Sequence, residues 1–240
     1  MVTEKIIGVL GGLGPWATVD LFEKILRLTP AQRDQDHLRI IIDNNPKIPD
    51  RSPAILGSGK DPTPALVATA VNLERAGADF IVIPCNTAHA FYGAIAAAVS
   101  IPVLHIMEEV ASAARQLVPG LLRVGILATR ATTAAGLYHR AFERIGVRVL
   151  APDDAGQEKV TRVIYGVKAG RHGAEGTRQV RPVADDLIAR GAQAIVLGCT
   201  ELPFVLRPSD VTVPLLDSNL ILAQAAVRVA MRRAEAASTR

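Results

Sequence analysis

Leu-Glu-Arg-Ala-Gly-Ala-Asp-Phe-Ile-Val-Ile-Pro-Cys-Asn-Thr, residues 73–87, recurs in the second half of the chain as Leu-Ile-Ala-Arg-Gly-Ala-Gln-Ala-Ile-Val-Leu-Gly-Cys-Thr-Glu, residues 187–201. At this offset of 114 residues, Gly77 falls on Gly191 and Cys85 falls on Cys199. Each stretch holds the end of a helical pattern, a short aliphatic run, and then a cysteine followed by a polar residue. The recurrence predicts two copies of one helix–strand unit, each with a cysteine where its strand ends.

Two shorter matches extend the repeat in both directions. Residues 7–10, Ile-Gly-Val-Leu, match residues 124–127 at an offset of 117, and residues 101–104, Ile-Pro-Val-Leu, match residues 213–216 at an offset of 112. Three matches in the same order and at nearly the same offset predict two similar α/β units. The break between the two units is expected near Pro119-Gly120, a composition typical of a domain boundary.

Short aliphatic runs alternate with helical patterns along the whole chain, which is the order typical of parallel sheets covered by helices. The expected strands are 6–10, 38–43, 80–84, 103–106, 124–128, 147–150, 194–197 and 213–216. The expected helices are 15–28, 62–76, 88–98, 107–117, 132–145, 157–169, 177–190 and 219–236. We therefore predict an α/β fold of two pseudo-symmetric domains, each a parallel-stranded sheet flanked by helices, with the active site in the cleft between them.

The composition excludes several classes of protein. The 240 residues are 49% hydrophobic, and no stretch approaches the roughly 18 apolar residues of a membrane span. Residues 6–15 contain four glycines and are expected to form a buried strand and turn rather than a signal peptide. The net charge of +4 is dispersed, without a run of five like charges, so nucleic-acid binding is not favoured. We expect a cytoplasmic protein, in which the two cysteines stay reduced and serve chemistry rather than a disulfide.

The two cysteines are the first candidates for catalysis. Because ligands bind at the carboxyl ends of parallel strands, Cys85 and Cys199 should flank one small molecule if the two units face each other. A free thiol has a pKa of about 8.5, so a modest downward shift gives a thiolate base on one side and a thiol acid on the other. Such a pair can invert a carbon by moving its proton. The competing interpretations are two buried cysteines that only pack, or a disulfide.

Other motifs are individually weaker. Residues 12–17, Gly-Leu-Gly-Pro-Trp-Ala, imitate a dinucleotide fingerprint, but Pro15 offers no N–H to a phosphate, which favours a tight turn beside a substrate. Arg51 follows a polar loop and could bind a carboxylate with two N–H groups, and Lys168 is either a carboxylate ligand or a helix-end lysine. The five histidines show no metal-ligand spacing, and His89 either influences the Cys85 thiol or packs.

Together these residues resemble the aspartate/glutamate racemase superfamily. The matching stretches run in family order over nearly the whole chain: residues 11–15, 44–46, 48–51, 84–89, 127–129, 167–170 and 198–201. The resemblance implies a two-domain, usually dimeric α/β enzyme that needs neither pyridoxal phosphate nor a metal. It implies a first domain of residues 1–118 with about 212–240, to which the C-terminal helix returns, and a second domain of residues 119–211.

The resemblance also assigns roles to particular residues. Cys85 and Cys199 would be the two acid–base residues, with Cys199 acting on the L-isomer and Cys85 on the D-isomer. The α-carboxylate and amino group would be bound at Asn86, Thr87, Thr129 and Thr200, and Arg51 with Lys168 would bind the second carboxylate. The implied activity is interconversion of L- and D-aspartate, an acidic amino acid being the only partner besides a second copy of the chain.

Two departures from the family pattern and several rival functions remain at this point. Arg130-Ala131-Thr132 stands where a Thr-Gly-Thr pattern is common in relatives, and Trp16 could reshape the entrance to the site. The rivals within the superfamily are a glutamate, broad-specificity or hydantoin racemase and a maleate isomerase, which uses one cysteine as a nucleophile. Outside it they are a non-catalytic binder of acidic amino acids and a dinucleotide-binding protein.

Overall fold

The first of two parallel sheets is built from the N-terminal strands. In the computed structural model, which describes residues 4–171 and 173–231, β1 (Ile7–Gly11) lies between β2 (Ile40–Asn44) and β3 (Phe80–Val82). Ile7 is in register with Ile40 on one side and with Phe80 on the other. A single parallel bridge between Ile81 and Val103 continues the sheet beyond β3.

The second sheet repeats this arrangement. Its strands are β4 (Arg123–Leu127), β5 (Arg148–Leu150), β6 (Ile195–Leu197) and β7 (Leu215–Asp217), in the spatial order β5-β4-β6-β7. Thus β4 corresponds to β1, β5 to β2, β6 to β3, and β7 to the bridge at Val103. The α/β fold with two similar parallel sheets is confirmed, as the internal repeat predicted.

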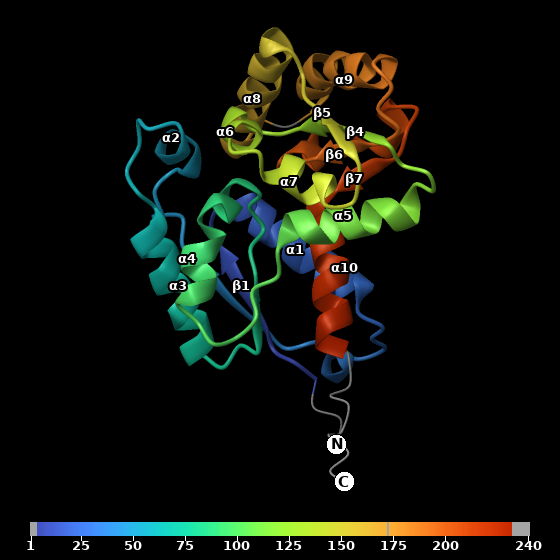
Figure 1. Ribbon diagram of the computed structural model, residues 1–240. Coiled ribbons are helices and arrows are strands. Elements are labelled where there is room, and N and C mark those ends of the chain that lie inside the picture. Colours follow the sequence, from blue (N-terminus) through green and yellow to red (C-terminus); the bar gives the residue numbers. More distant parts are fainter. Residues whose placement is uncertain (1–3, 172, 232–240) are drawn as a thin grey trace.

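Helices cover both faces of each sheet and form a shared layer between them (Figure 1). The α-helices are α1 (Pro15–Leu28), α2 (Arg51–Ile55), α3 (Thr63–Arg75), α4 (Tyr92–Ala97), α5 (Ile106–Leu117), α6 (Arg130–Ala134), α7 (Leu137–Glu143), α8 (Asp154–Lys168), α9 (Ala174–Ala189) and α10 (Ser218–Met231). The short 3-10 helices are η1 (Asp34–Asp36), η2 (Thr87–Phe91), η3 (Leu202–Phe204) and η4 (Pro208–Asp210). In Figure 1, α10 in red leaves the second sheet and runs beside α1, which it contacts along with α5.

Alternation along the strands decides which layer each side chain joins. In β4, Val124 and Ile126 join the central core with α5, α7 and α10, whereas Leu127 faces the outer helices α8 and α9. This is the period of two expected for a strand buried on both faces. The central core contains side chains from both halves of the chain, and burying one aliphatic side chain contributes about 1.5–3 kcal/mol.

Several elements differ from those predicted. Residues 103–106 form only the bridge at Val103, because α5 begins at Ile106. The helix expected over 132–145 is two helices, since Gly136 adopts φ 62° between α6 and α7. Residues 88–98, expected as one helix, form η2 and then α4.

The C-terminal region bears on the expected domain boundary. β7 pairs with β6, so residues 215–217 belong to the second sheet, although the first domain was expected to resume at about 212. α10, which follows directly, packs on α1 and α5. The division into domains stays a prediction, as does the end of the last helix at residue 236, which lies outside the described residues together with the basic pair at 232 and 233. None of the helices within residues 4–231 that the structure describes is long and apolar enough to cross a bilayer.

Candidate active site

The two cysteines lie on loops that follow equivalent strands. Cys85 comes shortly after β3 and Cys199 shortly after β6, and both side chains are buried and unpaired by a disulfide. The hydroxyl of Thr200 donates a hydrogen bond to the carbonyl of Pro84 at 3.2 Å. This bond joins the residue after one cysteine to the residue before the other. The two cysteine loops, 114 residues apart in the chain, are therefore in direct contact.

A pocket of about 310 Å³ opens between the two halves of the chain beside these loops. The first half contributes Gly12, Gly14, Pro15, Trp16, Pro46, Ile48, Asp50 and Arg51, and the second half contributes Val167, Lys168 and Glu201. Two predicted residues, Arg51 and Lys168, therefore line one pocket. Arg130 does not line it; it forms an exposed ion pair with Asp154 at 3.2 Å instead.

Arg51 is a buried guanidinium that is only partly used by the protein. It donates from Nη2 to the carbonyl of Leu13 at 2.9 Å and from Nη1 to the carbonyls of Pro49 and Ile48. Among the described residues its buried Nε–H has no partner. A guanidinium carries five N–H groups, so Nε–H and one Nη2–H form an edge that fits the two oxygens of a carboxylate. The polar loop predicted before Arg51 ends at this residue, because α2 begins there.

Asp50 connects this loop to the helix that carries Lys168. Its carboxylate caps α2 through the N–H of Ser52 and accepts a hydrogen bond from the hydroxyl of Tyr165 at 3.0 Å. Burial opposes ionisation of Asp50, but the Ser52 N–H, the nearby Lys168 ammonium and the Tyr165 hydroxyl outweigh it and lower the pKa of the carboxyl. Asp50 is therefore an anion on the pocket wall, holding α8 against the first half of the chain.

Lys168 lies within electrostatic reach of both cysteines. Burial lowers the pKa of its ammonium, but the nearby Glu201 carboxylate, followed by the Cys199 and Cys85 sulfurs, outweighs burial, and the net effect raises the pKa. Nζ also lies 5.2 Å from the centre of the Tyr165 ring, a cation–π contact. Lys168 is thus a cation at neutral pH on the wall of the pocket.

Cys199 is held by a carboxylate that sequence reasoning did not single out. Its Sγ donates a hydrogen bond to Oε2 of Glu201 at 2.9 Å. Burial and the charge of Glu201 raise the pKa of the Cys199 thiol well above its ordinary value, whereas Lys168 opposes this shift. The shift favours the protonated thiol of Cys199, whose hydrogen bond is directed at Glu201.

Asn86 is engaged by the protein rather than free for a substrate. Its Oδ1 accepts from the hydroxyl of Tyr138 at 2.6 Å, and its Nδ2 donates to Ser218 at 3.0 Å. Ser218 in turn donates to the carbonyl of Leu197 at 2.8 Å. The chain of bonds fixes the loop after Cys85 to α7, α10 and β6. The side chain of Asn86 thus holds the loop, and only its backbone N–H is left for the substrate role.

Three threonine hydroxyls form a buried cluster behind the cysteine loops. Thr87 contacts Thr132 at 2.9 Å and Thr129 at 3.3 Å, and Thr129 caps α6 by accepting from the N–H of Thr132. Thr200 uses its hydroxyl on the Pro84 carbonyl and the Glu201 carboxylate. None of the predicted threonines lines the pocket with its side chain, although all are buried next to the cysteine loops.

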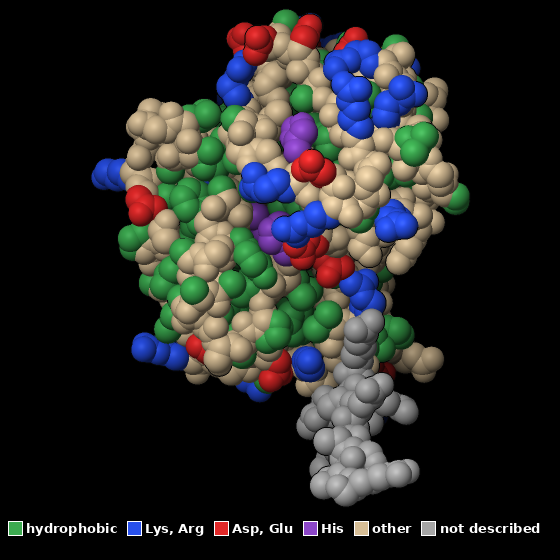
Figure 2. Space-filling model, in the orientation of Figure 1, with side chains coloured by type: hydrophobic (Ala, Val, Ile, Leu, Met, Phe, Trp, Pro, Cys, Tyr) green, Lys and Arg blue, Asp and Glu red, His purple; other side chains and the backbone are tan. Residues whose placement is uncertain are grey.

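His89 does not contact the thiol of Cys85. Its Nδ1 bonds to the Cys85 carbonyl at 2.9 Å, and its Nε2 lies 3.2 Å from the N–H of Ile106. Because a backbone N–H only donates, Nε2 is the acceptor and Nδ1 carries the hydrogen. Burial and the neighbouring His105 lower the pKa of His89 to about 4, so the ring is neutral near neutral pH. In Figure 2 histidine side chains (purple) lie in the middle of the face shown, among basic and acidic side chains.

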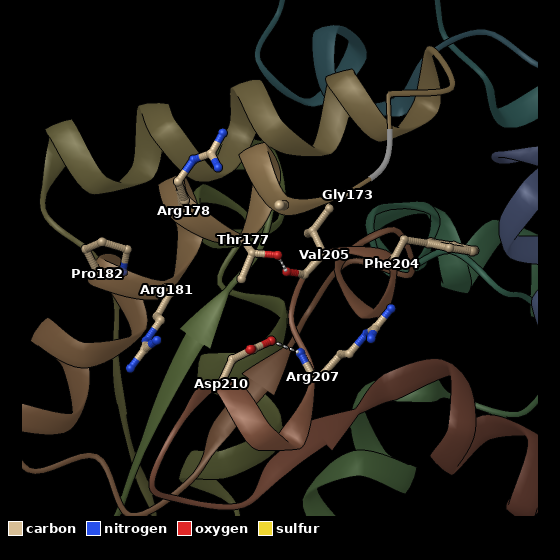
Figure 3. Close-up of a pocket in the computed structure, with 10 residues that line it drawn as sticks. Gly173, Thr177, Arg178, Arg181, Pro182, Phe204, Val205, Arg207 and Asp210 are labelled. Atoms are coloured by element: carbon tan, nitrogen blue, oxygen red, sulfur yellow. Dashed lines mark hydrogen bonds between the residues drawn. The ribbon is translucent and has the colours of Figure 1, made fainter.

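A second, larger hollow of about 620 Å³ lies on the second half of the chain (Figure 3). Its walls include Arg178, Arg181 and Arg207, whose side chains point in different directions in Figure 3. Arg178 pairs with Glu175 and Arg181 with Asp185. None of the predicted site residues lines this hollow. Its arginines do not converge on one point, so the smaller pocket beside the cysteines is the better candidate.

Gly12 brings the loop after β1 against the loop after β2 at the pocket edge. It adopts φ +87°, and a Cβ there would lie 2.4 Å from the carbonyl carbon of Asn45. We expect Gly12→Ala to lower the free energy of unfolding by roughly 1–3 kcal/mol, as measured by urea denaturation. Gly93→Ala on α4, where a Cβ meets no atom within 4 Å, is the control and should be neutral or slightly stabilising. Equal stability of the two variants would contradict this account.

The sequence signals account for part of this site. Cys85, Cys199, Arg51 and Lys168 were predicted; Arg51 and Lys168 line one pocket, while Cys85 and Cys199 do not line it but act electrostatically on Lys168. Glu201, Asp50, Tyr138 and Ser218 were missed. Glu201 and Asp50 both lie in stretches that match the family pattern, and the repeat also sets Glu201 opposite Thr87. Within residues 4–171 and 173–231, no three His, Cys, Asp or Glu side chains are grouped to hold a metal ion.

These features define a class of α/β proteins with two buried thiols on equivalent loops, beside a pocket lined by two basic and two acidic side chains. The family model of the Asp/Glu/hydantoin racemases matches residues 10–226. The broad specificity amino-acid racemase RacX of Bacillus subtilis is 31% identical over 228 residues, which cover 92% of this chain and 96% of that protein.

Solved structures agree with the sequence relatives. The Picrophilus torridus aspartate racemase aligns with a TM-score of 0.84 and 31% identity over 95% of each chain. An aspartate racemase homologue from Pyrococcus horikoshii OT3 aligns with a TM-score of 0.78 and 27% identity over 95% of this chain and 100% of that one. The chain belongs to the Asp/Glu/hydantoin racemase family and is an amino-acid racemase of that family.

Proposed function

We propose that this enzyme interconverts L- and D-aspartate without a cofactor, moving the α-proton between Cys85 and Cys199. The observation that carries the proposal is the contact of the two cysteine loops beside one pocket, with Lys168 in reach of both sulfurs. One thiol would take the proton from one face of the α-carbon while the other returns a proton to the opposite face.

We propose that the two carboxylates of the substrate are bound by different groups of the protein. The N–H groups of Thr87 and Ala88 precede the first backbone bond of η2, which His89 donates to Asn86, and they would hold the α-carboxylate, where charge builds as the proton leaves. Lys168 and Arg51, whose Nε–H has no partner among the described residues, would bind the side-chain carboxylate. The proposed role of Asn86, Thr87, Thr129 and Thr200 is to shape and support these loops.

A broad-specificity amino-acid racemase is the second candidate. Ile48, Val167 and the half-exposed Trp16 give the same pocket apolar walls that a neutral side chain would contact. One methylene between aspartate and glutamate discriminates weakly, by about 1–3 kcal/mol. The homodimer implied by the resemblance, a cytoplasmic location and the lack of nucleic-acid binding stay predictions.

A chiral assay of the purified enzyme against a panel of L-amino acids, in D₂O and without pyridoxal phosphate, tests the proposal. We expect aspartate to be racemised fastest and the D-aspartate formed to carry deuterium at the α-carbon, because the returning proton comes from an exchangeable thiol. Similar kcat/KM values for neutral amino acids would favour the broad-specificity candidate. Inactivity on every amino acid, with a covalent adduct on incubation with maleate, would instead indicate a maleate isomerase.

A further inference from the structure

Glu201 is the residue at which the two halves of the site cease to be equivalent. The repeat sets Cys199-Thr200-Glu201 against Cys85-Asn86-Thr87, so that Glu201 faces a threonine in the alignment. Thr87 turns toward other threonine hydroxyls, whereas Glu201 turns toward the sulfur of Cys199. Within the part of the chain that the structure describes, no carboxylate accepts a hydrogen bond from Cys85. The carboxylate therefore serves one thiol of the pair.

The carboxyl group of Glu201 lies between the Cys199 sulfur and the pocket. Its Oε2 is 2.9 Å from Sγ, and the side chain is 2% exposed. A Cβ built on Gly14 at the pocket wall would lie 3.3 Å from the other oxygen, Oε1. One oxygen thus faces the thiol and the other faces the wall where substrate is proposed to bind. A carboxyl group in this position can exchange a proton with the sulfur without any movement of the backbone.

The neighbouring hydroxyl accommodates Glu201 in either protonation state. Thr200 Oγ1 lies 3.2 Å from the Pro84 carbonyl and 3.3 Å from Oε2 of Glu201. With Glu201 ionised, both neighbours accept, and the single hydroxyl proton of Thr200 serves one of them at a time. With Glu201 protonated, its O–H can donate to the Cys199 sulfur or to Thr200, whose own proton then serves Pro84. Neither state leaves Glu201 without a hydrogen bond.

We infer that Glu201 is the proton acceptor of Cys199. Between turnovers its carboxylate accepts a hydrogen bond from the Cys199 thiol, and it takes the thiol proton when Cys199 acts as the base. The inference rests on the proposed two-thiol mechanism and makes Glu201 a positioning residue for it. The S–H bond of Cys199 breaks and an O–H bond forms on Oε2. The thiolate then takes the α-proton of the substrate, and the Cys85 thiol delivers a proton to the opposite face. When product leaves, Cys85 regains a proton through solvent as Glu201 gives one up.

This sequence keeps the charge of the buried site constant. Before and after the transfer across the α-carbon, Cys85, Cys199 and Glu201 share two protons and carry one negative charge near Lys168; during the transfer this negative charge is on the substrate. Burial and the nearby Glu201 raise the pKa of the Cys199 thiol, which is why a thiolate there needs a partner that accepts its proton. Racemisation of the opposite isomer passes through the same protonation states in reverse order. Both directions therefore include a state in which Glu201 is protonated.

Alkylation of Cys199 tests the contact without any need for racemase activity. The chain has two cysteines, so Cys85→Ser leaves Cys199 as the only thiol. In that background we expect Glu201→Gln to speed the reaction with iodoacetamide at neutral pH by about tenfold or more, because Lys168 then stabilises the thiolate unopposed. Glu175→Gln on the exposed surface of α9 is the matched control and should leave the rate unchanged. The inference is overturned if Glu201→Gln leaves both the alkylation rate at neutral pH and the pH dependence of that rate unchanged.

Racemisation by variants that retain both cysteines tests the transfer itself. Glu201→Gln should lower kcat on the order of 100-fold in both directions, although its Cys199 is more readily ionised. Glu201→Asp keeps an ionisable carboxyl group and should recover part of this loss, which also controls for a folding defect. Full activity of Glu201→Gln overturns the inference. Racemisation by Cys199→Ser at the rate of the unmodified enzyme would instead overturn the two-thiol function, while the alkylation result would still report on the Glu201 contact.

Discussion

Cys85→Ser and Cys199→Ser are each expected to lower kcat for racemisation of aspartate by about 10²- to 10⁴-fold in both directions. A serine hydroxyl is far less acidic than a thiol, so it supplies neither the thiolate base nor the acid that must act on the opposite face. Because the two isomers have equal free energy in water, kcat/KM must fall equally for L- and D-aspartate. The measurement is initial racemisation rate by chiral chromatography, starting from each isomer.

The two variants are expected to differ in the isomer from which they still remove a proton. Cys85→Ser retains the thiol that faces one side of the α-carbon, and Cys199→Ser retains the thiol that faces the other. Each variant should therefore exchange the α-hydrogen of one isomer with D₂O, slowly and without inversion, and the favoured isomer should be opposite in the two. The double variant is the control and should exchange neither isomer. Exchange of the same isomer by both variants would contradict opposed thiols.

The sequence was sufficient to predict the fold because the same pattern is present twice. One copy of a βα pattern leaves the sheet order open, but two copies at nearly one offset imply two similar sheets, and the strand orders are indeed equivalent. Differences arise where local sequence acts against the pattern. Gly136 adopts a left-handed conformation and breaks the helix predicted over 132–145, and α5 begins so early that the strand predicted at 103–106 is reduced to one bridge.

The predicted site residues are those that follow a strand end or belong to a motif. Cys85 and Cys199 could be predicted because loops after parallel strands gather at one edge of a sheet. Tyr138 and Ser218 could not, because they reach Asn86 from 52 and 132 residues away and no local pattern marks such a contact. The supporting role of Asn86 was missed for the same reason, since its partners lie on α7 and α10.

Lys168→Met is expected to raise the KM for aspartate on the order of 100-fold or more. Removing one member of a buried charged pair costs about 2–5 kcal/mol, and here the ammonium is the cation that a dicarboxylate would meet beside Arg51. Asparagine carries a neutral amide where aspartate carries its side-chain carboxylate, so the KM for asparagine should rise much less. The ratio of the two kcat/KM values, measured by chiral chromatography, is therefore expected to fall.

Lys159→Met on the same helix is the matched control for this change. Lys159 is exposed on α8, so the substitution alters the same kind of side chain without touching the pocket, and the KM for aspartate should stay unchanged. Lys168→Met should also lower stability in urea, since it removes a positive charge that acts on the buried carboxylate of Glu201. A fall in kcat with an unchanged KM and an unchanged preference for aspartate would mean that Lys168 serves the thiols alone. In that case Arg51, with its unpaired Nε–H, would have to bind the side-chain carboxylate by itself.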